Sequence, residues 1–270
     1  MPASPSAPAR SAIVTRLRAA GCVFAEDEAR LLISAARTAA DLTDMMERRA
    51  AGQPLEHVIG WAEFCGLRIA VDRGVFVPRR RTEFLVRQAA ALARRADARR
   101  PAVVVDLCCG SGALGAALAA ALGQVELHAA DIDPAAVRCA RRNIAAPGQV
   151  YEGDLYDPLP ATLRGRVDIL VANVPYVPTA EIGLLPAEAR VHEARVALDG
   201  GADGLGLLRR VTAAAPSWLA PWGRLLAETS ERQAPQAVET IGQGGLIPRL
   251  ARSDELNATV VTGTNQPARS

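Results

Sequence analysis

Four residues in the second half of the chain, Asn173-Val-Pro-Tyr176, have types suited to holding a planar amide or aryl amine. The lone pair of such a nitrogen is delocalised, so an enzyme must aim this poor nucleophile at an electrophile. The side-chain oxygen of Asn173 can accept one N–H hydrogen bond, and the main-chain carbonyl of Val174 can accept the other. Tyr176 can cover the planar group and exclude water, while Pro175 stiffens the turn. The tetrapeptide therefore predicts a site that positions a nitrogen for group transfer.

A turn of small residues follows the apolar run Val103–Leu107 and predicts a cofactor site. Gly110 and Gly112 allow positive φ and lack the Cβ atoms that would keep a ligand away from the main chain. The amides at the start of the next helix can face a carboxylate of the ligand. Asp106 adds an acid within the strand itself.

Two more carboxylates follow later strands. Asp131 comes about 20 residues after the turn, where a carboxylate that accepts both ribose hydroxyls is expected, and Asp154 can accept from an adenine amine. The text Gly110-Ser-Gly-Ala-Leu-Gly115 also matches the GxGxxG pattern of nicotinamide-binding domains, which makes a dehydrogenase the rival interpretation. Asp106 and the Asn173–Tyr176 motif favour S-adenosylmethionine.

These motifs fall at the ends of apolar runs that read as strands. The expected strands, mostly separated by Ala-rich helical stretches, are Val103–Leu107, Val125–Ala130, Val150–Glu152, Ile169–Ala172, Arg224–Glu228, Arg249–Ala251 and Thr259–Thr262. Alternating strands and helices are typical of a parallel, doubly wound sheet, in which ligands bind at the carboxyl ends of the strands. The expected fold class is therefore α/β.

The residues before this alternation predict two smaller parts. Apolar residues recur at helical spacing in three stretches of the first fifty residues, and Asp41–Asp44 is the expected N-terminal cap of the third. Alternating apolar residues around Gly66 and Gly74, from Val58 to Val77, predict a β-hairpin that links the two units. A helix is expected over Arg81–Arg95.

Composition limits the class of protein. No stretch approaches the roughly 18 uninterrupted apolar residues of a membrane span, and Pro and Ser stand where a signal peptide would have its apolar core. A cytoplasmic protein without membrane contact is expected. The five cysteines form no metal-ligand spacing, and their odd number argues against a disulfide framework, so no metal site is expected.

Charge gives little support for nucleic-acid binding, because the formal net charge is only +2. One arginine-rich stretch can contact a phosphate backbone, although a solvated helix face explains it as well. Its members are Arg79, Arg80, Arg81, Arg87, Arg94, Arg95, Arg99 and Arg100.

The motifs, taken in order, resemble those of the release factor glutamine methyltransferases over nearly the whole chain. They are Pro54–Gly60, Glu63–Gly66, Val77–Arg79, Asp106–Gly112, Asp131–Pro134, Gly153–Leu159, Asn173–Pro178 and Ala197–Gly204. The resemblance implies a seven-stranded class I S-adenosylmethionine-dependent methyltransferase (Rossmann-like) domain over residues 79–270. It also implies a small N-terminal helical domain that docks the substrate, residues 1–56, and a β-hairpin linker, residues 57–78.

In that family the tetrapeptide is Asn-Pro-Pro-Tyr and binds the glutamine of a Gly-Gly-Gln loop in peptide chain release factors. The resemblance implies an enzyme that methylates the side-chain amide nitrogen of a glutamine in a release factor or related protein. Asn173, Val174, Pro175 and Tyr176 are the expected catalytic residues. The residues expected around S-adenosylmethionine are Asp106, Cys108, Cys109, Gly110, Ser111, Gly112, Asp131, Asp154, Leu155 and Asn173.

The chain departs from the family at two places near the expected site. Val174 replaces the first proline of the tetrapeptide, and Arg80 and Arg81 replace a Pro and a Glu, which reverses the local charge. Two alternatives stay open. One is a methyltransferase that acts on an exocyclic amine of DNA or RNA, although no separate target-recognition domain is visible. The other is a non-catalytic S-adenosylmethionine-binding interaction protein.

Overall fold

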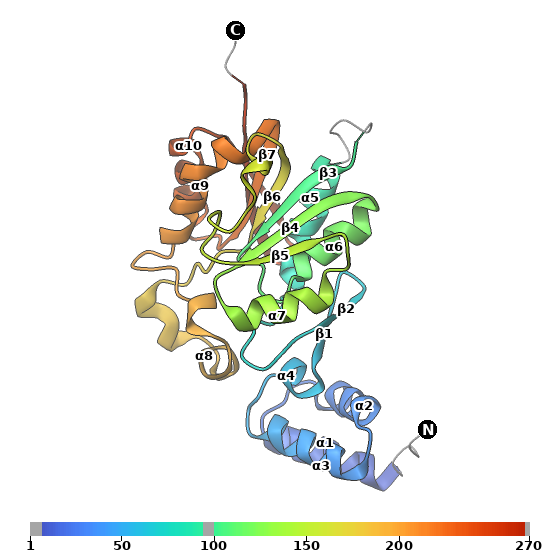
Figure 1. The fold of residues 1–270 in the computed structure, drawn as a ribbon. Helices are drawn as coiled ribbons and strands as arrows, with labels where there is room; N and C mark the ends of the chain where they lie inside the picture. The colour runs from blue at the N-terminus through green and yellow to red at the C-terminus, as the bar shows by residue number, and fades with distance from the viewer. Residues whose placement is uncertain (1–6, 94–99, 268–270) are drawn as a thin grey trace.

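The computed structural model describes residues 7–93 and 100–267, and Figure 1 shows their arrangement. A twisted central sheet carries helices on both faces, a two-stranded hairpin leaves one end of it, and a small helical module lies beyond the hairpin. In these two described ranges, no helix is long and apolar enough to cross a membrane.

The central sheet has seven strands in the order β5-β4-β3-β6-β7-β9-β8. Their bounds are β3 (Ala102–Leu107), β4 (Val125–Asp131), β5 (Gln149–Glu152), β6 (Val167–Ala172), β7 (Leu219–Thr229), β8 (Ile247–Ser253) and β9 (Ala258–Thr264). β9 runs antiparallel to β7 and β8, whereas β3 to β7 pair in parallel. The strand order reverses between β3 and β6, which is where ligands bind in such sheets. The expected α/β class is confirmed.

Helices cover the sheet because their apolar faces supply the two halves of its core. α5 (Glu83–Ala93), α6 (Ala113–Leu122) and α7 (Pro134–Asn143) pack on one face, and α9 (Gly206–Trp218) and α10 (Ala234–Gln243) pack on the other. The expected helix over Arg81–Arg95 opens with the 3-10 turn η1 (Arg80–Thr82). Arg94, Arg95 and Arg99 lie outside the described residues.

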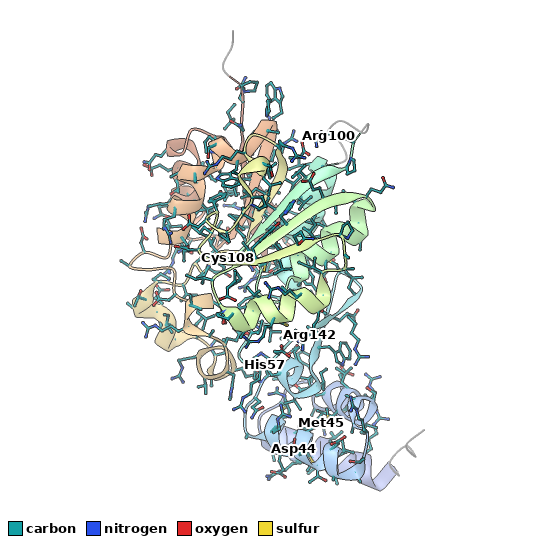
Figure 2. All side chains as sticks on the ribbon, in the orientation of Figure 1. Asp44, Met45, His57, Arg100, Cys108 and Arg142 are labelled. Atoms are coloured by element: carbon teal, nitrogen blue, oxygen red, sulfur yellow. The ribbon has the colours of Figure 1, made fainter. Side chains whose placement is uncertain are left out.

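The N-terminal module consists of α1 (Ala7–Ala19), α2 (Ala25–Ala35), α3 (Ala39–Ala50) and α4 (Leu55–Ile59). Leu17, Leu32 and Met45 are buried in its own apolar core, and Met45 is labelled in Figure 2. The expected cap of α3 at Asp41–Asp44 is wrong. Thr38 is the capping residue, because its side chain accepts the Asp41 N–H and the helix already begins at Ala39.

The hairpin is shorter than its alternating sequence suggested. β1 (Trp61–Phe64) pairs with β2 (Leu67–Ala70) around the turn Cys65-Gly66. Val58 belongs to α4, and Gly74 lies beyond the paired strands, where it forms a parallel bridge with Glu193. The apolar residues Val71, Val75 and Val77 are buried although the strand pairing has ended, so burial alone accounts for the apolar pattern beyond β2.

Asn143, the last residue of α7, fastens the hairpin to the sheet domain. Its Oδ1 accepts the Ala70 N–H at 2.8 Å, and its Nδ2 donates to the Ala70 carbonyl at 2.8 Å. Nδ2 also lies 2.8 Å from the Ser111 carbonyl, in the turn after β3. One amide thus joins the hairpin to the predicted cofactor turn.

Asn143→Ala is expected to lower the free energy of unfolding by about 2 kcal/mol, because it leaves partly buried backbone groups without their partner. Urea denaturation at neutral pH measures this loss. Gln149→Ala, which removes an exposed amide bonded to the Pro147 carbonyl, is the control and should change stability by less than about 0.5 kcal/mol. Equal effects of the two substitutions would contradict a fastening role for Asn143.

Candidate active site at the carboxyl ends of the strands

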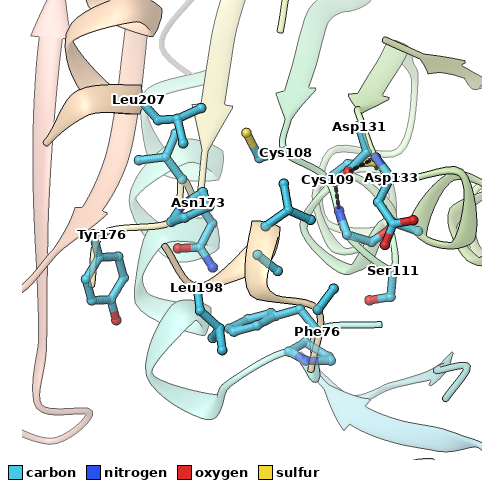
Figure 3. A pocket seen from close by; sticks show the side chains of 18 of the residues that line it. Phe76, Cys108, Cys109, Ser111, Asp131, Asp133, Asn173, Tyr176, Leu198 and Leu207 are labelled. Carbon is cyan, nitrogen blue, oxygen red and sulfur yellow. Dashed lines mark hydrogen bonds between the residues drawn. The ribbon is translucent and has the colours of Figure 1, made fainter. Parts of the chain in front are cut away.

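A cavity of about 490 Å³ opens at the carboxyl ends of β3, β4 and β6 (Figure 3). All four residues of Asn173–Tyr176 line it, as do Cys108, Cys109, Gly110, Ser111, Asp131, Asp154 and Leu155 from the expected cofactor set. Asp106 and Gly112 are not among the described residues that line it. The parallel strands therefore bring together most of the residues singled out in the sequence, although these span about a quarter of the chain.

Gly110 and Gly112, the two glycines of the turn, have different surroundings. A Cβ built on Gly110 would meet nothing within 4 Å, so the main chain there is open to a ligand. A Cβ on Gly112 would lie 3.1 Å from side-chain atoms of Ala140 and Ile144. Gly112 thus permits close packing of α6 on α7, and the expectation that its main chain approaches the cofactor stays a prediction. Both glycines have positive φ, 55° at Gly110 and 76° at Gly112.

Asp131 ends β4 with both carboxylate oxygens held by the main chain. Its Oδ2 accepts the Gly110 N–H at 2.8 Å, and its Oδ1 accepts the Asp133 N–H at 2.9 Å. Burial raises the pKa of Asp131, and these hydrogen bonds oppose the rise. Each oxygen keeps a lone pair, so the carboxylate is oriented and can still accept hydroxyl groups from the cavity.

Asp106 lies behind the turn with no exposed surface. Its Oδ2 accepts the Gly115 N–H at 2.9 Å in the first turn of α6, whereas its Oδ1 is buried without a partner among the described residues. Burial raises the pKa of Asp106 to about 7. The side chain ties β3 to α6 and so shapes the turn from behind.

Asp154 is a partly exposed acid at the cavity. Its Oδ2 accepts from Arg210 Nη2 at 2.6 Å, and both residues line the cavity. A ligand amine that approached Asp154 would share the carboxylate with this arginine. Leu155, the next residue, has a positive φ of 50° and is buried against the same cavity.

Asn173 lines the cavity and carries an acceptor without a partner. Its Oδ1 is buried and has no hydrogen-bond partner among the residues that the structure describes, and Figure 3 shows the side chain directed into the space between Leu198 and Cys108. Leaving such a group unpaired costs about 1–3 kcal/mol unless a ligand or water satisfies it. The arrangement suits an N–H donor in the cavity.

Tyr176 is anchored through both its hydroxyl and its main chain. The hydroxyl contacts Arg81 and lies 3.4 Å from Glu228 Oε1, while Gln233 Nε2 donates to the Tyr176 carbonyl at 2.9 Å. Burial raises the pKa of Tyr176 to about 12, so the phenol stays protonated at neutral pH. Arg81 Nε also donates to the buried Glu228 carboxylate at 2.8 Å. Arg81, which reverses the charge found at this position in the family, is therefore paired with the buried carboxylate of Glu228.

Two glycines let another loop pack directly on Asn173–Tyr176. A Cβ on Gly200 would come within 2.7 Å of the Pro175 carbonyl oxygen, and one on Gly204 would collide with the Tyr176 carbonyl. Gly204 also has a φ of 77°. Gly200 and Gly204 of the Ala197–Gly204 motif thus let this loop support the tetrapeptide.

Part of the cavity comes from residues that sequence reasoning missed. Phe76 and Thr82 line it from the end of the linker and from η1, and residues 185–198 supply another side. Glu193 is buried, with its Oε1 2.6 Å from Arg79 Nη2. The Val77–Arg79 motif was visible in the sequence, but its acidic partner more than one hundred residues later carried no local signal.

Known proteins are similar to this chain in sequence and in fold. The family model described as the methyltransferase small domain matches residues 67–227. A release factor glutamine methyltransferase from Geobacter sulfurreducens is 36% identical over 81% of this chain and 75% of its own length. A 4-amino-L-phenylalanine/4-methylamino-L-phenylalanine methyltransferase from Streptomyces pristinaespiralis is 37% identical over 70% of this chain and 65% of its own. A solved methyltransferase from Pyrococcus furiosus, 15% identical, superposes with a TM-score of 0.56 over 75% of this chain and 90% of that one.

Gly204→Ala is expected to lower turnover at least about tenfold, because the new Cβ displaces Tyr176 and misplaced groups lose orientation. Steady-state methyl transfer measures the loss. Gly201→Ala is a matched control, since Gly201 has a φ of 88° but no atom within 4 Å of its Cβ position. Equal losses in the two variants would assign the effect to backbone strain alone.

Asp106→Asn is expected to flatten the pH dependence of stability. The pKa of Asp106 rises from 3.8 to about 7 in the folded state, so between these values the folded protein holds a proton that the unfolded chain releases. The free energy of unfolding therefore falls as pH rises, by roughly 2–4 kcal/mol from this group. Asparagine keeps an acceptor for the Gly115 N–H and cannot ionise. Denaturant unfolding at pH 5 and pH 8 measures the free energy of unfolding of parent and variant. An equal change of this free energy between the two pH values in both proteins would refute the prediction.

Proposed function

The chain belongs to the family of release factor glutamine methyltransferases, and we propose that it transfers a methyl group from S-adenosylmethionine to the side-chain amide nitrogen of a protein glutamine. The proposed acceptor is the Gly-Gly-Gln loop of a peptide chain release factor, or a closely related glutamine-bearing loop. A cytoplasmic setting, where translation factors work, follows from that acceptor.

The observation that carries the proposal is the unpaired, buried Oδ1 of Asn173. A glutamine amide has two N–H groups, and it can donate one to this oxygen and the other to the Val174 carbonyl. The neighbouring ring of Tyr176 then limits the tilt of the amide plane. Held in this way, the nitrogen has little freedom except along the direction of attack, which is the main contribution that positioning makes to such a reaction.

The cavity also fits the cofactor that the family and fold imply. Bound there, S-adenosylmethionine supplies an electrophilic methyl group on its sulfonium. We propose that the oriented carboxylate of Asp131 accepts the ribose hydroxyls and that the open main chain at Gly110 lies against the ligand. Cys108, Cys109, Ser111, Asp154 and Leu155 line the same side. Asp106 and Gly112 would act indirectly, by shaping the turn.

The arginine-rich stretch gives little support to a nucleic-acid acceptor. Arg79, Arg81, Arg87 and Arg100 each pair with a carboxylate of the same chain. Paired guanidiniums contribute less net charge toward phosphates, so the stretch is better explained as part of the fold. A protruding peptide loop can also enter a narrow cavity without the unstacking that a duplex base requires.

The acceptor is tested by labelled methyl transfer at matched concentrations to four samples. These are purified release factor, the same factor with its Gly-Gly-Gln glutamine replaced by alanine, DNA with RNA, and free 4-amino-L-phenylalanine. Label is expected only on the intact release factor. Label confined to nucleic acid or to the free aryl amine would defeat the proposed acceptor, and label on none of the samples would favour the non-catalytic alternative.

Asn173→Ala is expected to lower turnover on the true acceptor at least about a hundredfold, because the nitrogen loses its orienting acceptor. The affinity for S-adenosylmethionine should change far less, since Asp131 and the glycine turn remain. Single-turnover rates and calorimetry separate the two quantities. Retention of more than about a tenth of the parent rate would rule out the clamp.

A further inference from the structure

Residues 185–198 form one wall of the cavity, and we call this segment the acceptor wall. It follows η3 (Thr179–Leu184), contains α8 (Ala187–His192) and η4 (Arg195–Ala197), and lies on the side of the sheet nearest the N-terminal module (Figure 1). Its cavity-lining residues include Leu185, Glu188, Ala189, Ala194 and Leu198. Short helical turns provide few hydrogen bonds of their own, so contacts with other elements must hold the wall in place.

The linker holds one end of the acceptor wall. Glu193 Oε1 accepts from Arg79 Nη2 at 2.6 Å and from the Val77 N–H at 3.2 Å. The Ala194 N–H donates to the Gly74 carbonyl at 3.0 Å. These bonds fix the part of the wall that follows α8.

The N-terminal module holds the other end through Arg49 of α3. Arg49 Nη1 donates to Glu188 Oε1 at 2.6 Å and to the Gln53 carbonyl at 3.0 Å. Its Nε and Nη2 donate to the two oxygens of Glu28 at 2.6 and 3.1 Å. The Arg49 side chain is only 9% exposed, whereas that of Glu188 is 48% exposed.

Glu28 therefore holds the guanidinium within the module, and the same guanidinium binds Glu188 of the acceptor wall. Burial by itself would lower the pKa of Arg49, but the hydrogen bonds and charges of Glu28 and Glu188 raise it, so the residue stays charged. Glu28 binds it in a fork that fixes the plane of the group. The remaining Nη1 then points at α8 from a fixed position.

We propose that Arg49 is a positioning residue for methyl transfer, which sets the acceptor wall through Glu188 and so makes the shape of the acceptor side depend on the N-terminal module. The module would then do more than offer a surface for the acceptor protein, because it would complete the cavity. Only the activity measurement below depends on the proposed function, since the exchange measurement needs no acceptor.

Hydrogen exchange of the full chain reports the wall directly. In Glu188→Ala, the amides of Arg190 and Glu193, which are hydrogen-bonded within the wall, should exchange at least about fivefold faster. Fivefold corresponds to about 1 kcal/mol, the upper range for a partly exposed ion pair. The matched control is Glu181→Ala, which removes the Arg232 ion pair from the neighbouring η3 without touching the module. Its effect should stay outside residues 188–198. Equal loosening in both variants would overturn the proposal.

A double-mutant cycle separates positioning from direct contact with the acceptor, because Glu188 itself lines the cavity. The second background is Glu28→Met with Arg49→Met, which replaces the buried pair by apolar side chains of similar length and often preserves folding. In the parent, Glu188→Ala should raise the KM for release factor about fivefold with kcat nearly unchanged. The Met background is itself expected to have a similarly raised KM. Glu188→Ala in that background should therefore raise the KM by less than a further factor of about 1.5.

Each outcome decides the question. A full fivefold effect of Glu188→Ala in both backgrounds would show that Glu188 touches the acceptor by itself and would refute the role of Arg49. Failure of the Met background to fold, checked by thermal unfolding, leaves the exchange comparison as the deciding measurement. Absence of activity on release factor with faster wall exchange in Glu188→Ala would sink the proposed acceptor and retain the positioning contact.

Discussion

The polar groups that a parallel sheet collects at its carboxyl ends are buried, and each must find a hydrogen-bond partner there. In this chain the main chain satisfies most of them. The Gly110 and Asp133 amides hold Asp131, and the Gly115 amide holds Asp106. The Asn173 oxygen is left unpaired where the strand order reverses. The rest of the structure keeps this acceptor buried and oriented beside the cavity.

That support depends on ion pairs between segments far apart in the chain. Arg79 with Glu193, Arg81 with Glu228 and Arg49 with Glu188 connect the linker, η1 and the N-terminal module to the elements that surround the cavity. Replacing one partner of a buried pair is costly because it leaves an uncompensated charge. The family's acidic residue at position 81 would face Glu228 here. The arginine at this position instead forms a pair that holds the Tyr176 hydroxyl.

Family membership and acceptor identity rest on different parts of the molecule. Under the proposed function, the cofactor turn, Asp131 and the tetrapeptide would serve any reaction that brings a planar nitrogen to the same methyl donor. The relatives named above include one whose name gives a protein acceptor and one whose name gives a free amino acid acceptor. The acceptor wall and the module that holds it are the elements that can distinguish these acceptors. Selection of a protein loop is therefore a matter of what surrounds the clamp.

The strands, the glycine turn and the order of the motifs could all be predicted from the amino-acid sequence. All seven expected strands are present, because hydrophobic periodicity and turn chemistry are local properties that neighbouring residues decide. Their bounds are wider than expected, most of all in β7 and β8. The local sequence was misleading at the start of α3, where Thr38 caps the helix ahead of Asp41–Asp44.

Only the tertiary structure decided which distant residues meet. No periodicity links Arg79 to Glu193, Arg49 to Glu188 or Gly204 to Tyr176, because each pair joins segments that the fold alone brings together. The burial of Asp106 and the unpaired oxygen of Asn173 are likewise products of packing. Residue types specify what chemistry is available, whereas desolvation and close contact, which need the whole fold, decide where it is used.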